Sequence, residues 1–338
     1  MEIVCILYFV SWLLNKMANN TKEIRRRIKS INNTRKITKA MEMVSAAKMR
    51  RAVASVLAIR PYAHSAWSVL TNLARVFEIH GRGLLEVREV RSVLMIAVTS
   101  NRGLCGSFNA QVAKKIREEL ASPERLKVNR VGTKRIESKV KDGELKIDFI
   151  TIGKKGESVI RKLGREIVAT FPELTYLPKI EDVRAVAKVA IDDYIAKKYD
   201  KVVVVYTDYV SAVVQQPKIR QILPISKVDI EKMIADIDVH AQELGLKEPK
   251  TEYKIEPSPK EVLEYILPRL IEMQIYHAIL ESNASKESAR MLAMRNATDA
   301  AGEMSDSLTL AYNQIRQSKI TQEIAEISAG AAALSQNH

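Results

Sequence analysis

The C-terminal part of the chain carries a helical pattern of apolar and polar positions. From Arg269 to His338 there is no proline and only two glycines, Gly302 and Gly330, while apolar and small residues recur at alternating steps of three and four. About 70 residues at about 1.5 Å each give a helix of roughly 100 Å. We expect so long a helix to need a partner along its length, because helices in water are stabilised mainly by burying an apolar stripe.

The N-terminal part of the chain has a matching apolar stripe. No proline or glycine occurs between Asn20 and Arg60. The apolar residues at or near helical spacing are Ile24, Ile28, Ile31, Met41 and Val44, followed by Ala46, Ala47, Ala52 and Ala54. Pro61 should kink or restart this helix, which we expect to continue through Trp67, Leu70 and Leu73.

We expect the two ends to pair as an antiparallel coiled coil. The predicted a and d positions of its C-terminal strand are Met294, Ala297, Ala301, Met304, Leu308, Ala311 and Ile315. The seam continues in a shifted frame through Ile320, Ile324, Ile327, Ala331 and Leu334, which predicts a looser supercoil near Ser318. Charge favours the pairing, because the segment Lys22–Arg51 has eleven basic and two acidic residues, whereas Lys260–Glu326 is mildly acidic.

The middle of the chain alternates short apolar strands with amphipathic helices. Strands are predicted at Ser92–Thr99, Lys146–Ile152 and Lys201–Thr207, and helices at Asn109–Leu120, Glu157–Phe171 and Glu181–Lys197. Extended structure follows from Tyr209 to Ile225, interrupted by Pro217, then a short helix, a last strand near Tyr253 and a helix start at Ser258–Pro259. This order is typical of a mainly parallel sheet covered by helices.

The predicted fold class is therefore α+α/β. A long antiparallel coiled coil of N- and C-terminal helices carries an inserted Rossmann-like α/β domain. We expect the N-terminal coiled-coil helix at residues 17–80, the α/β domain at residues 90–257 and the C-terminal coiled-coil helix at residues 258–338.

Residues 1–16 form an atypical apolar extension outside this pattern. The run Ile3–Leu14 is too short to span a bilayer and has neither a basic start nor a small-residue cleavage site. Two interpretations remain open: a short membrane anchor, or a mis-assigned start codon with the working chain beginning at Met17.

Composition indicates a soluble protein with a strongly basic surface. Apolar residues make up 46% of the chain, enough for a core, and the two cysteines, Cys5 and Cys105, cannot form a disulfide framework, which suggests a reducing compartment. A net charge of +14 fits a solvated face, an acidic protein partner or nucleic acid. The basic stretch lacks aromatic residues that stack on bases, but charge alone does not decide between these.

The sequence does not favour an enzyme. The phosphate-binding patterns GxxxxGK[ST] and GxGxxG are absent, and the five histidines are dispersed without metal-ligand spacing. Cys105 has no visible base. The Gly103–Gly106 loop follows a strand, so an α/β enzyme with helical arms would bind its ligand there, but a tight turn explains the glycines as well. We expect no catalytic centre, metal or cofactor in this chain.

Four motifs in the chain closely resemble the gamma subunit of the F-type ATP synthase. These are ITKAMEMVSAAKMRR at 37–51, TSNRGLCG at 99–106, ARMLAM at 289–294 and YNQIRQSKITQEIAEISAGAAAL at 312–334. The resemblance runs from Met17 to Leu334 and includes the EPSP junction at 256–259, while residues 1–16 lie outside it. The chain lacks the additional cysteine pair of the chloroplast regulatory type, so thiol control by that device should be absent.

The resemblance implies a non-catalytic rotor subunit. In this family the terminal helices form a shaft inside a ring of three alpha and three beta subunits, and the α/β domain rests on the membrane c ring beside the epsilon subunit. Proton or sodium flow turns the c ring and the shaft, which changes the conformation of each beta subunit in turn. The implied location is the cytoplasmic face of the bacterial membrane, as a peripheral protein. The alternative, a nucleic-acid-binding coiled coil, is opposed by the motifs.

The resemblance also assigns roles to individual residues. Met41, with Lys39 beside it, matches the methionine near the acidic loop of beta, although a simple seam position explains Met41 too. The matched positions for contact with beta or for internal support of the shaft are Arg290, Arg316, Gln317, Thr321, Glu323 and Glu326. Lys218 and Arg220 match a loop that faces the c ring. The small residues of Ala325–Leu334 suit a bearing, or equally a frayed helix end.

Overall fold

The structure is a computed structural model that describes residues 2–59, 61–63, 65, 83–131, 134–138, 140, 144–172, 174, 178–225 and 258–335. Two predictions lie outside these residues: the helical continuation through Trp67, Leu70 and Leu73, and the short helix and strand between Ser226 and Pro257.

Two long helices form the ends of the chain. Helix α1 spans Glu2–Ala58 and ends just before Pro61, as expected, and helix α8 spans Pro259–Ser335. Helix α8 begins where the Ser258–Pro259 signal predicted. The hydroxyl of Ser258 accepts a hydrogen bond from the backbone N–H of Glu261 (3.3 Å), and proline at the first helical position has no N–H to leave unpaired.

The chain divides into two compact units, and both boundaries fall inside the long helices. One unit comprises Met1–Met43 and Ala293–His338, and the other comprises Val44–Leu292. Each long helix therefore contributes one part to the helical pair and another part to the unit that contains the sheet.

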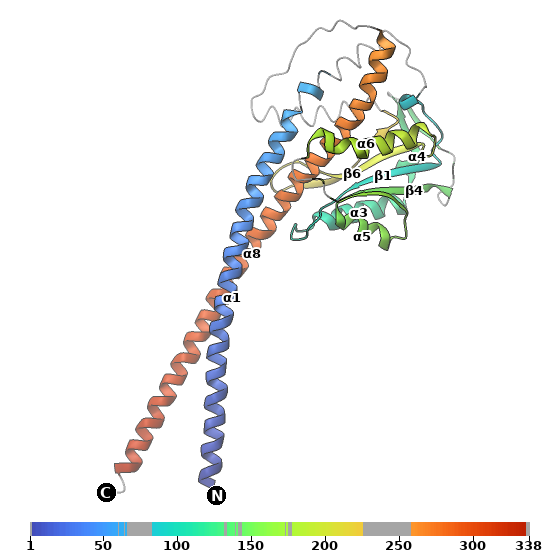
Figure 1. The fold of residues 1–338 in the computed structure, drawn as a ribbon. Helices are drawn as coiled ribbons and strands as arrows, with labels where there is room; N and C mark the ends of the chain where they lie inside the picture. The colour runs from blue at the N-terminus through green and yellow to red at the C-terminus, as the bar shows by residue number, and fades with distance from the viewer. Residues whose placement is uncertain are drawn as a thin grey trace. The chain divides into compact units, whose positions relative to one another are not determined.

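In the first unit α1 and α8 run antiparallel; they cross and then diverge toward the ends marked N and C, which lie at the same end of the unit (Figure 1). The order of the contacts agrees, because Thr38 bonds to Thr298 while the earlier residue Asn32 bonds to the later residue Ser305. The predicted antiparallel coiled coil of the two chain ends is confirmed.

The seam of this pair keeps one heptad frame but differs in detail from the predicted one. On α8 the inward positions follow steps of four and three: Met294, Thr298, Ala301, Ser305, Leu308, Tyr312 and Ile315. The prediction that Met304 belongs to the seam is wrong, since its side chain is 55% exposed and Ser305 is buried instead. Val44 of α1 is likewise exposed, and its neighbour Ser45 is buried.

The predicted change of frame after Ser318 is also wrong. Ile320, Ile324 and Ile327 are exposed, so they form no seam with α1. The half-buried residues of this stretch, Lys319 and Gln322, bond to Glu323 and Glu326 of the same helix. Three isoleucines are left on the outer face of α8.

The second unit is built on a five-stranded sheet of order β5-β4-β1-β6-β7. Its strands are β1 (Ser92–Val98), β4 (Lys146–Ile152), β5 (Ile167–Phe171), β6 (Lys201–Tyr209) and β7 (Gln215–Leu223). Strands β5, β4, β1 and β6 are parallel, and β7 returns antiparallel to β6. The expected Rossmann-like sheet is confirmed.

Helices cover both faces of this sheet, with α3 and α5 on one side and α6 on the other (Figure 1). Their bounds are Phe108–Ala121 for α3, Lys154–Lys162 for α5 and Ile180–Ile195 for α6. Alternate strand residues face the two layers: Val93 and Met95 pack with α3 and α5, while Leu94 and Ile96 pack with α6 and α8. Nearly continuous apolar strands are expected in a sheet covered on both faces.

The remaining short elements are η1 (Gly83–Leu85), α4 (Glu124–Lys127) and a two-stranded ribbon of β2 (Val128–Val131) and β3 (Lys134–Glu137).

One predicted helix is wrong in its second half. The segment Glu157–Phe171 was expected to be helical throughout, but α5 ends at Lys162 and β5 begins at Ile167. Gly164 lies between them with a φ of +66°, the left-handed conformation that ends many helices. The following residues, Ile167–Phe171, are mostly β-branched or aromatic, which favours a strand.

Candidate coupling surfaces

Two hydrogen bonds between side chains fix the register of the helical pair. The Thr298 hydroxyl donates to Thr38 Oγ1 (2.8 Å), which donates in turn to the carbonyl of Arg35 (3.0 Å). One heptad further along α8, Ser305 Oγ donates to Asn32 Oδ1 (3.1 Å). A slip of either helix by one heptad would separate these buried polar groups, which are costly to leave unpaired. Polar residues at inward positions are known to specify the register of coiled coils.

A glycine allows close packing between these two contacts. A Cβ atom placed on Gly302 would lie 3.4 Å from the guanidinium carbon of Arg35. The Arg35 side chain therefore crosses α8 at the point where α8 has no side chain. Thr38, Arg35 and Asn32 thus face Thr298, Gly302 and Ser305 in antiparallel order.

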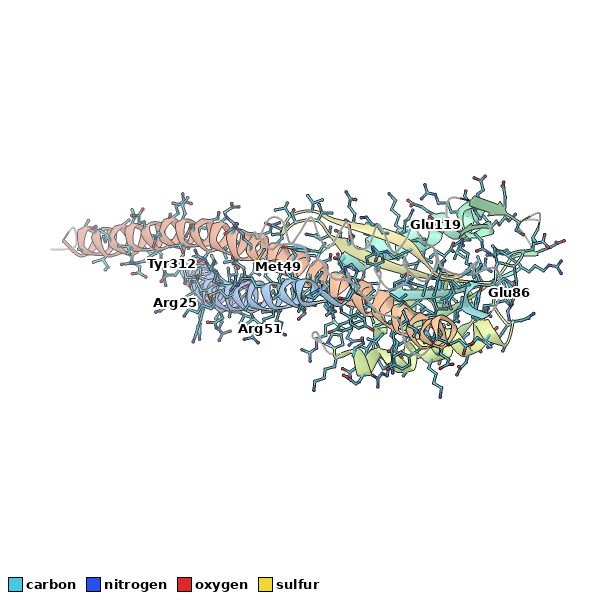
Figure 2. All side chains as sticks on the ribbon, turned by 90° about the horizontal axis from the view of Figure 1, so that it is seen from above. Arg25, Met49, Arg51, Glu86, Glu119 and Tyr312 are labelled. Atoms are coloured by element: carbon cyan, nitrogen blue, oxygen red, sulfur yellow. The ribbon has the colours of Figure 1, made fainter. Side chains whose placement is uncertain are left out.

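The outer surface of α1 is strongly basic. Besides Arg35, which packs on Gly302 of α8, its exposed cations are Lys22, Arg25, Arg26, Arg27, Lys29, Lys36, Lys39, Arg50 and Arg51. Arg25 and Arg51, labelled in Figure 2, both extend outward from α1. Two of the cations pair with acids on the same helix, Arg27 with Glu23 (2.6 Å) and Lys39 with Glu42 (3.1 Å). Exposed pairs of this kind contribute little stability, so the positive surface remains.

The predicted site residues near the end of α8 are exposed. Arg316, Gln317, Thr321, Glu323 and Glu326 all lie on the solvent side of the helix. Glu323 pairs with Lys319 (3.8 Å), and Glu326 accepts a hydrogen bond from Gln322 (2.9 Å). Gln317 and Thr321 line an open groove together with Gln314, Ser318, Gln322 and Ala325.

An apolar stripe runs beside these polar residues. Ile320, Ile324 and Ile327 follow one another at steps of four and three, and Ile324 and Ile327 are 59% and 72% exposed. Steps of four and three place the side chains on one face of a helix. Aligned isoleucines on a solvent-facing helix are typical of a surface that another molecule covers.

The predicted site residues are divided between the two units. Lys39 and Met41 belong to the first unit, where Lys39 is exposed and Met41 is half-buried. Arg290 belongs to the second unit and is held by Glu287 on the same helix, with 2.6 Å between its Nη1 and the carboxylate oxygen. Both side chains of this pair are largely buried.

The two residues predicted for c-ring contact lie on β7, and only one of them is accessible. Lys218 is partly exposed and pairs with Asp208 (2.5 Å). Arg220 is 6% exposed, with its guanidinium 3.3 Å from His277 Nδ1 and over the ring of Tyr206. Arg220 therefore makes its contacts inside its own unit. A contact with another subunit stays a prediction for Lys218 alone.

The Gly103–Gly106 loop is a closed turn. Ser100 Oγ donates to the carbonyl of Arg102 (2.7 Å), and the Asn109 amide donates to Ser100 Oγ (2.8 Å) and to Cys105 Sγ (3.2 Å). These groups satisfy one another around the buried Cys105 thiol. The pattern is that of a tight strand-to-helix turn.

A small cavity lies near the carboxyl ends of β1, β4 and β5. Its lining includes Thr99, Asn101, Asn283 and Lys286, and its volume of about 20 Å³ is room for about one water molecule. Burial lowers the pKa of Lys286 to about 8, against the opposing effect of Glu287, and its ammonium donates to Asn283 Oδ1 (2.6 Å). Among the described residues there is also no cluster of metal-ligating side chains. The cavity does not suit a nucleotide.

Sequence reasoning missed the polar contacts that organise both units. Asn32, Thr38, Thr298 and Ser305 occupy inward positions of a heptad that apolar residues were expected to fill. Two heptad counts start from Met294: steps of three then four lead to Met304, and steps of four then three lead to Ser305, so spacing alone did not decide between them. The buried charges of β6, β7 and α8 gave no local signal, because the bonded residues are 72 and 57 positions apart in the chain.

The comparisons with known proteins agree with these features. The family model described as ATP synthase matches residues 20–334. The ATP synthase gamma chain of Chloroflexus aurantiacus is 41% identical over 318 residues, covering 93% of this chain and 99% of that protein. The gamma chains of Roseiflexus castenholzii and Legionella pneumophila are 39% and 37% identical, covering 94% and 93% of this chain and 99% of each relative.

Solved structures share the fold. A chain of the Euglena gracilis mitochondrial ATP synthase, in a structure of OSCP, F1 and c ring, has a TM-score of 0.59 at 17% identity and covers 94% of this chain and 95% of its own. A chain from the central stalk and c ring of the Tetrahymena thermophila enzyme has a TM-score of 0.52 at 22% identity and covers 77% and 99%. In the described part of the chain no helix is long and apolar enough to cross a membrane. The chain belongs to the family of ATP synthase gamma chains.

Proposed function

We propose that this chain couples ion-driven rotation of a membrane c ring to conformational change in catalytic beta subunits. The observation that carries the proposal is the paired helix ends, whose outer face presents a basic surface on α1 and an isoleucine stripe on α8. A two-helix rod held in register by buried polar contacts resists sliding of one helix along the other. Such a rod is suited to transmit torque.

The charge of one surface and the apolar character of the other each match a proposed partner. The cations of α1, including Lys39 beside Met41, suit an acidic loop of beta, because opposite charge favours the encounter of two proteins. The isoleucine stripe and the small residues that follow it suit an apolar sleeve of alpha and beta subunits around the tail of α8. As the shaft turns, polar side chains of α8 would exchange hydrogen bonds with beta; these are Arg316, Gln317, Thr321, Glu323 and Glu326.

The sheet unit is proposed to rest on the c ring with the epsilon subunit, and Lys218 is the candidate for contact with polar loops of the ring. The chain itself would bind no cofactor, metal or nucleic acid and would catalyse nothing. In a bacterial cell the complex would hold it at the cytoplasmic face of the membrane as a peripheral protein. Rotation would change which beta conformation is favoured, because each orientation of the shaft offers different contacts.

Reconstitution tests the proposal. The purified chain should hydrolyse no ATP alone, but with alpha, beta and epsilon subunits and a c-ring membrane sector it should restore ATP hydrolysis coupled to ion pumping. The variant Met41→Lys places a second cation near the proposed acidic loop and should reduce pumping per ATP, while Met43→Lys, at an exposed position two residues on, serves as control. Failure of the wild-type chain to co-assemble with alpha and beta would overturn the proposal.

A further inference from the structure

Charged side chains are buried where the β6–β7 hairpin packs on α8, within the unit that contains the sheet. Four of these side chains are less than a tenth exposed: Asp208 of β6, Arg220 of β7, and His277 and Glu281 of α8. His277 and Glu281 are completely buried. Tyr206 stacks on Arg220, and Lys218 pairs with Asp208 from the rim. Buried ions are costly unless they are paired, so the positions of the protons decide whether this packing is stable.

The hydrogen bonds define the protonation of His277. A guanidinium can only donate, so His277 Nδ1, 3.3 Å from Arg220 Nη1, accepts. The ring proton then sits on Nε2, which faces Glu281 Oε1 at 3.4 Å. His277 is therefore neutral in the closed arrangement and directs an N–H toward Glu281.

The surroundings of Glu281 favour its protonated form. Its Oε2 accepts a hydrogen bond from the backbone N–H of Tyr209 (2.8 Å). Asp208 has a counter-ion in Lys218, whereas Glu281 is completely buried. A proton on Glu281 removes a buried negative charge that the charge of Asp208 would repel.

We propose that Glu281 is a proton-dependent latch that holds the β6–β7 hairpin on α8. Opening the hairpin exposes Glu281 to water, where it releases its proton; closing requires the proton to return. A second attachment does not titrate: Ser288 of α8 donates to the carbonyl of Ala212, and Gln215 donates to Ser288 (3.3 Å). The tip that the latch positions carries three exposed valines, Val210, Val213 and Val214.

The pH range of the latch follows from the two states. Burial, and then the charge of Asp208, raise the pKa of Glu281 to about 8 in the closed state, against an ordinary value of 4.5. Between these values opening releases a proton, so opening becomes up to about tenfold more favourable for each unit of rising pH, and no further above pH 8. An exposed histidine binds a proton below about pH 6.5. Below that pH, opening the hairpin adds a proton to His277 while it releases one from Glu281, so the two changes offset each other. The stability of the latch therefore depends on pH only between about pH 6.5 and 8.

The latch is thus tightest in mildly acidic conditions and weakest in mildly alkaline ones. Because the proposal concerns packing within one unit of the chain, it stands apart from the proposed rotor function.

Hydrogen exchange on the full-length chain tests the latch. The amides of Thr207 and Tyr209, which donate to Ser282 and Glu281 of α8, are followed by NMR from pH 6 to 9, with rates corrected for the intrinsic pH dependence of exchange. Amides bonded between β6 and β7 stay paired when the hairpin leaves α8 and serve as the internal reference. We expect protection to fall about 10- to 30-fold between pH 6.5 and 8 and then level off. The variant Glu281→Gln keeps the shape of the protonated side chain and should show protection that does not change with pH.

Two further variants separate the latch from a general effect of folding. Glu287→Gln removes another buried acid six residues along α8, one that pairs with Arg290, and should keep the wild-type pH dependence. Asp208→Asn removes the neighbouring charge and should move the fall in protection to lower pH, which is measurable even if Glu281→Gln does not fold. Wild-type protection that is constant from pH 6.5 to 8, or a fall retained in Glu281→Gln, would overturn the proposal.

Discussion

Replacing Ile324 and Ile327 together with aspartate should weaken assembly with alpha and beta subunits by at least about 100-fold while leaving the isolated chain equally stable. Both side chains are mostly exposed, so their loss removes little packing from the chain itself. In an apolar sleeve each buried isoleucine contributes about 1.5–3 kcal/mol, and two of them about 3–6 kcal/mol, which corresponds to a factor of 100 or more.

Assembly is measured by titrating labelled chain with an alpha–beta mixture, and stability by urea unfolding. The matched control is Ile195→Asp, since Ile195 is 56% exposed at the end of α6 in the other unit and should leave assembly with alpha and beta unchanged. Tight assembly of the double variant would show that the stripe is not covered by these subunits.

Replacing Gly153 with alanine should destabilise the sheet unit by about 3–4 kcal/mol. Gly153 precedes α5 with a φ of +96°, and a Cβ atom there would lie 2.5 Å from the carbonyl oxygen of Thr99. The backbone of Thr99 cannot retreat easily, because its N–H donates to Ile152 (2.8 Å) and its hydroxyl accepts from the Gly156 N–H (2.8 Å). The cost combines an unfavourable φ with overpacking between Thr99 and Gly153, which follow the ends of the neighbouring strands β1 and β4.

Gly164→Ala is the control for this variant. Gly164 also has a positive φ, +66°, but no atom lies within 4 Å of a Cβ placed there. Its replacement should cost only about 1 kcal/mol, the penalty of the left-handed backbone alone. Urea unfolding combined with hydrogen exchange of β1 and β4 amides measures both variants. Equal losses would contradict the proposed clash with Thr99.

The sequence predicted the long elements well because their periods are sustained over many residues. Repeated apolar spacing and clear Gly, Pro or Ser boundaries predicted the antiparallel helix pair, the strands β1, β4 and β6, and helix α6. Strand β5 was missed because only four residues separate it from helix α5 and the apolar spacing of the helix continues into it. The left-handed Gly164 was the local sign of that boundary.

The details of both candidate sites depend on contacts that local patterns do not contain. Apolar preference placed Met304 in the seam, but the hydrogen bond from Ser305 to Asn32 defines the register actually adopted. The resemblance placed Arg220 at a subunit contact, but folding brings His277 against it from 57 residues away. Long-range pairs of this kind emerge only when the whole chain is folded.

Direct observation of rotation tests the central claim. Lys114 on α3 is well exposed, so a Lys114→Cys variant in which Cys5 is replaced by serine can carry a bead through biotin, while the native Cys105 is buried. Alpha and beta subunits assembled with this chain are fixed to a surface and supplied with ATP. The account predicts that the bead turns continuously in one direction and stops when ATP is removed. ATP hydrolysis by the assembled complex with a bead that shows no directed rotation would contradict it.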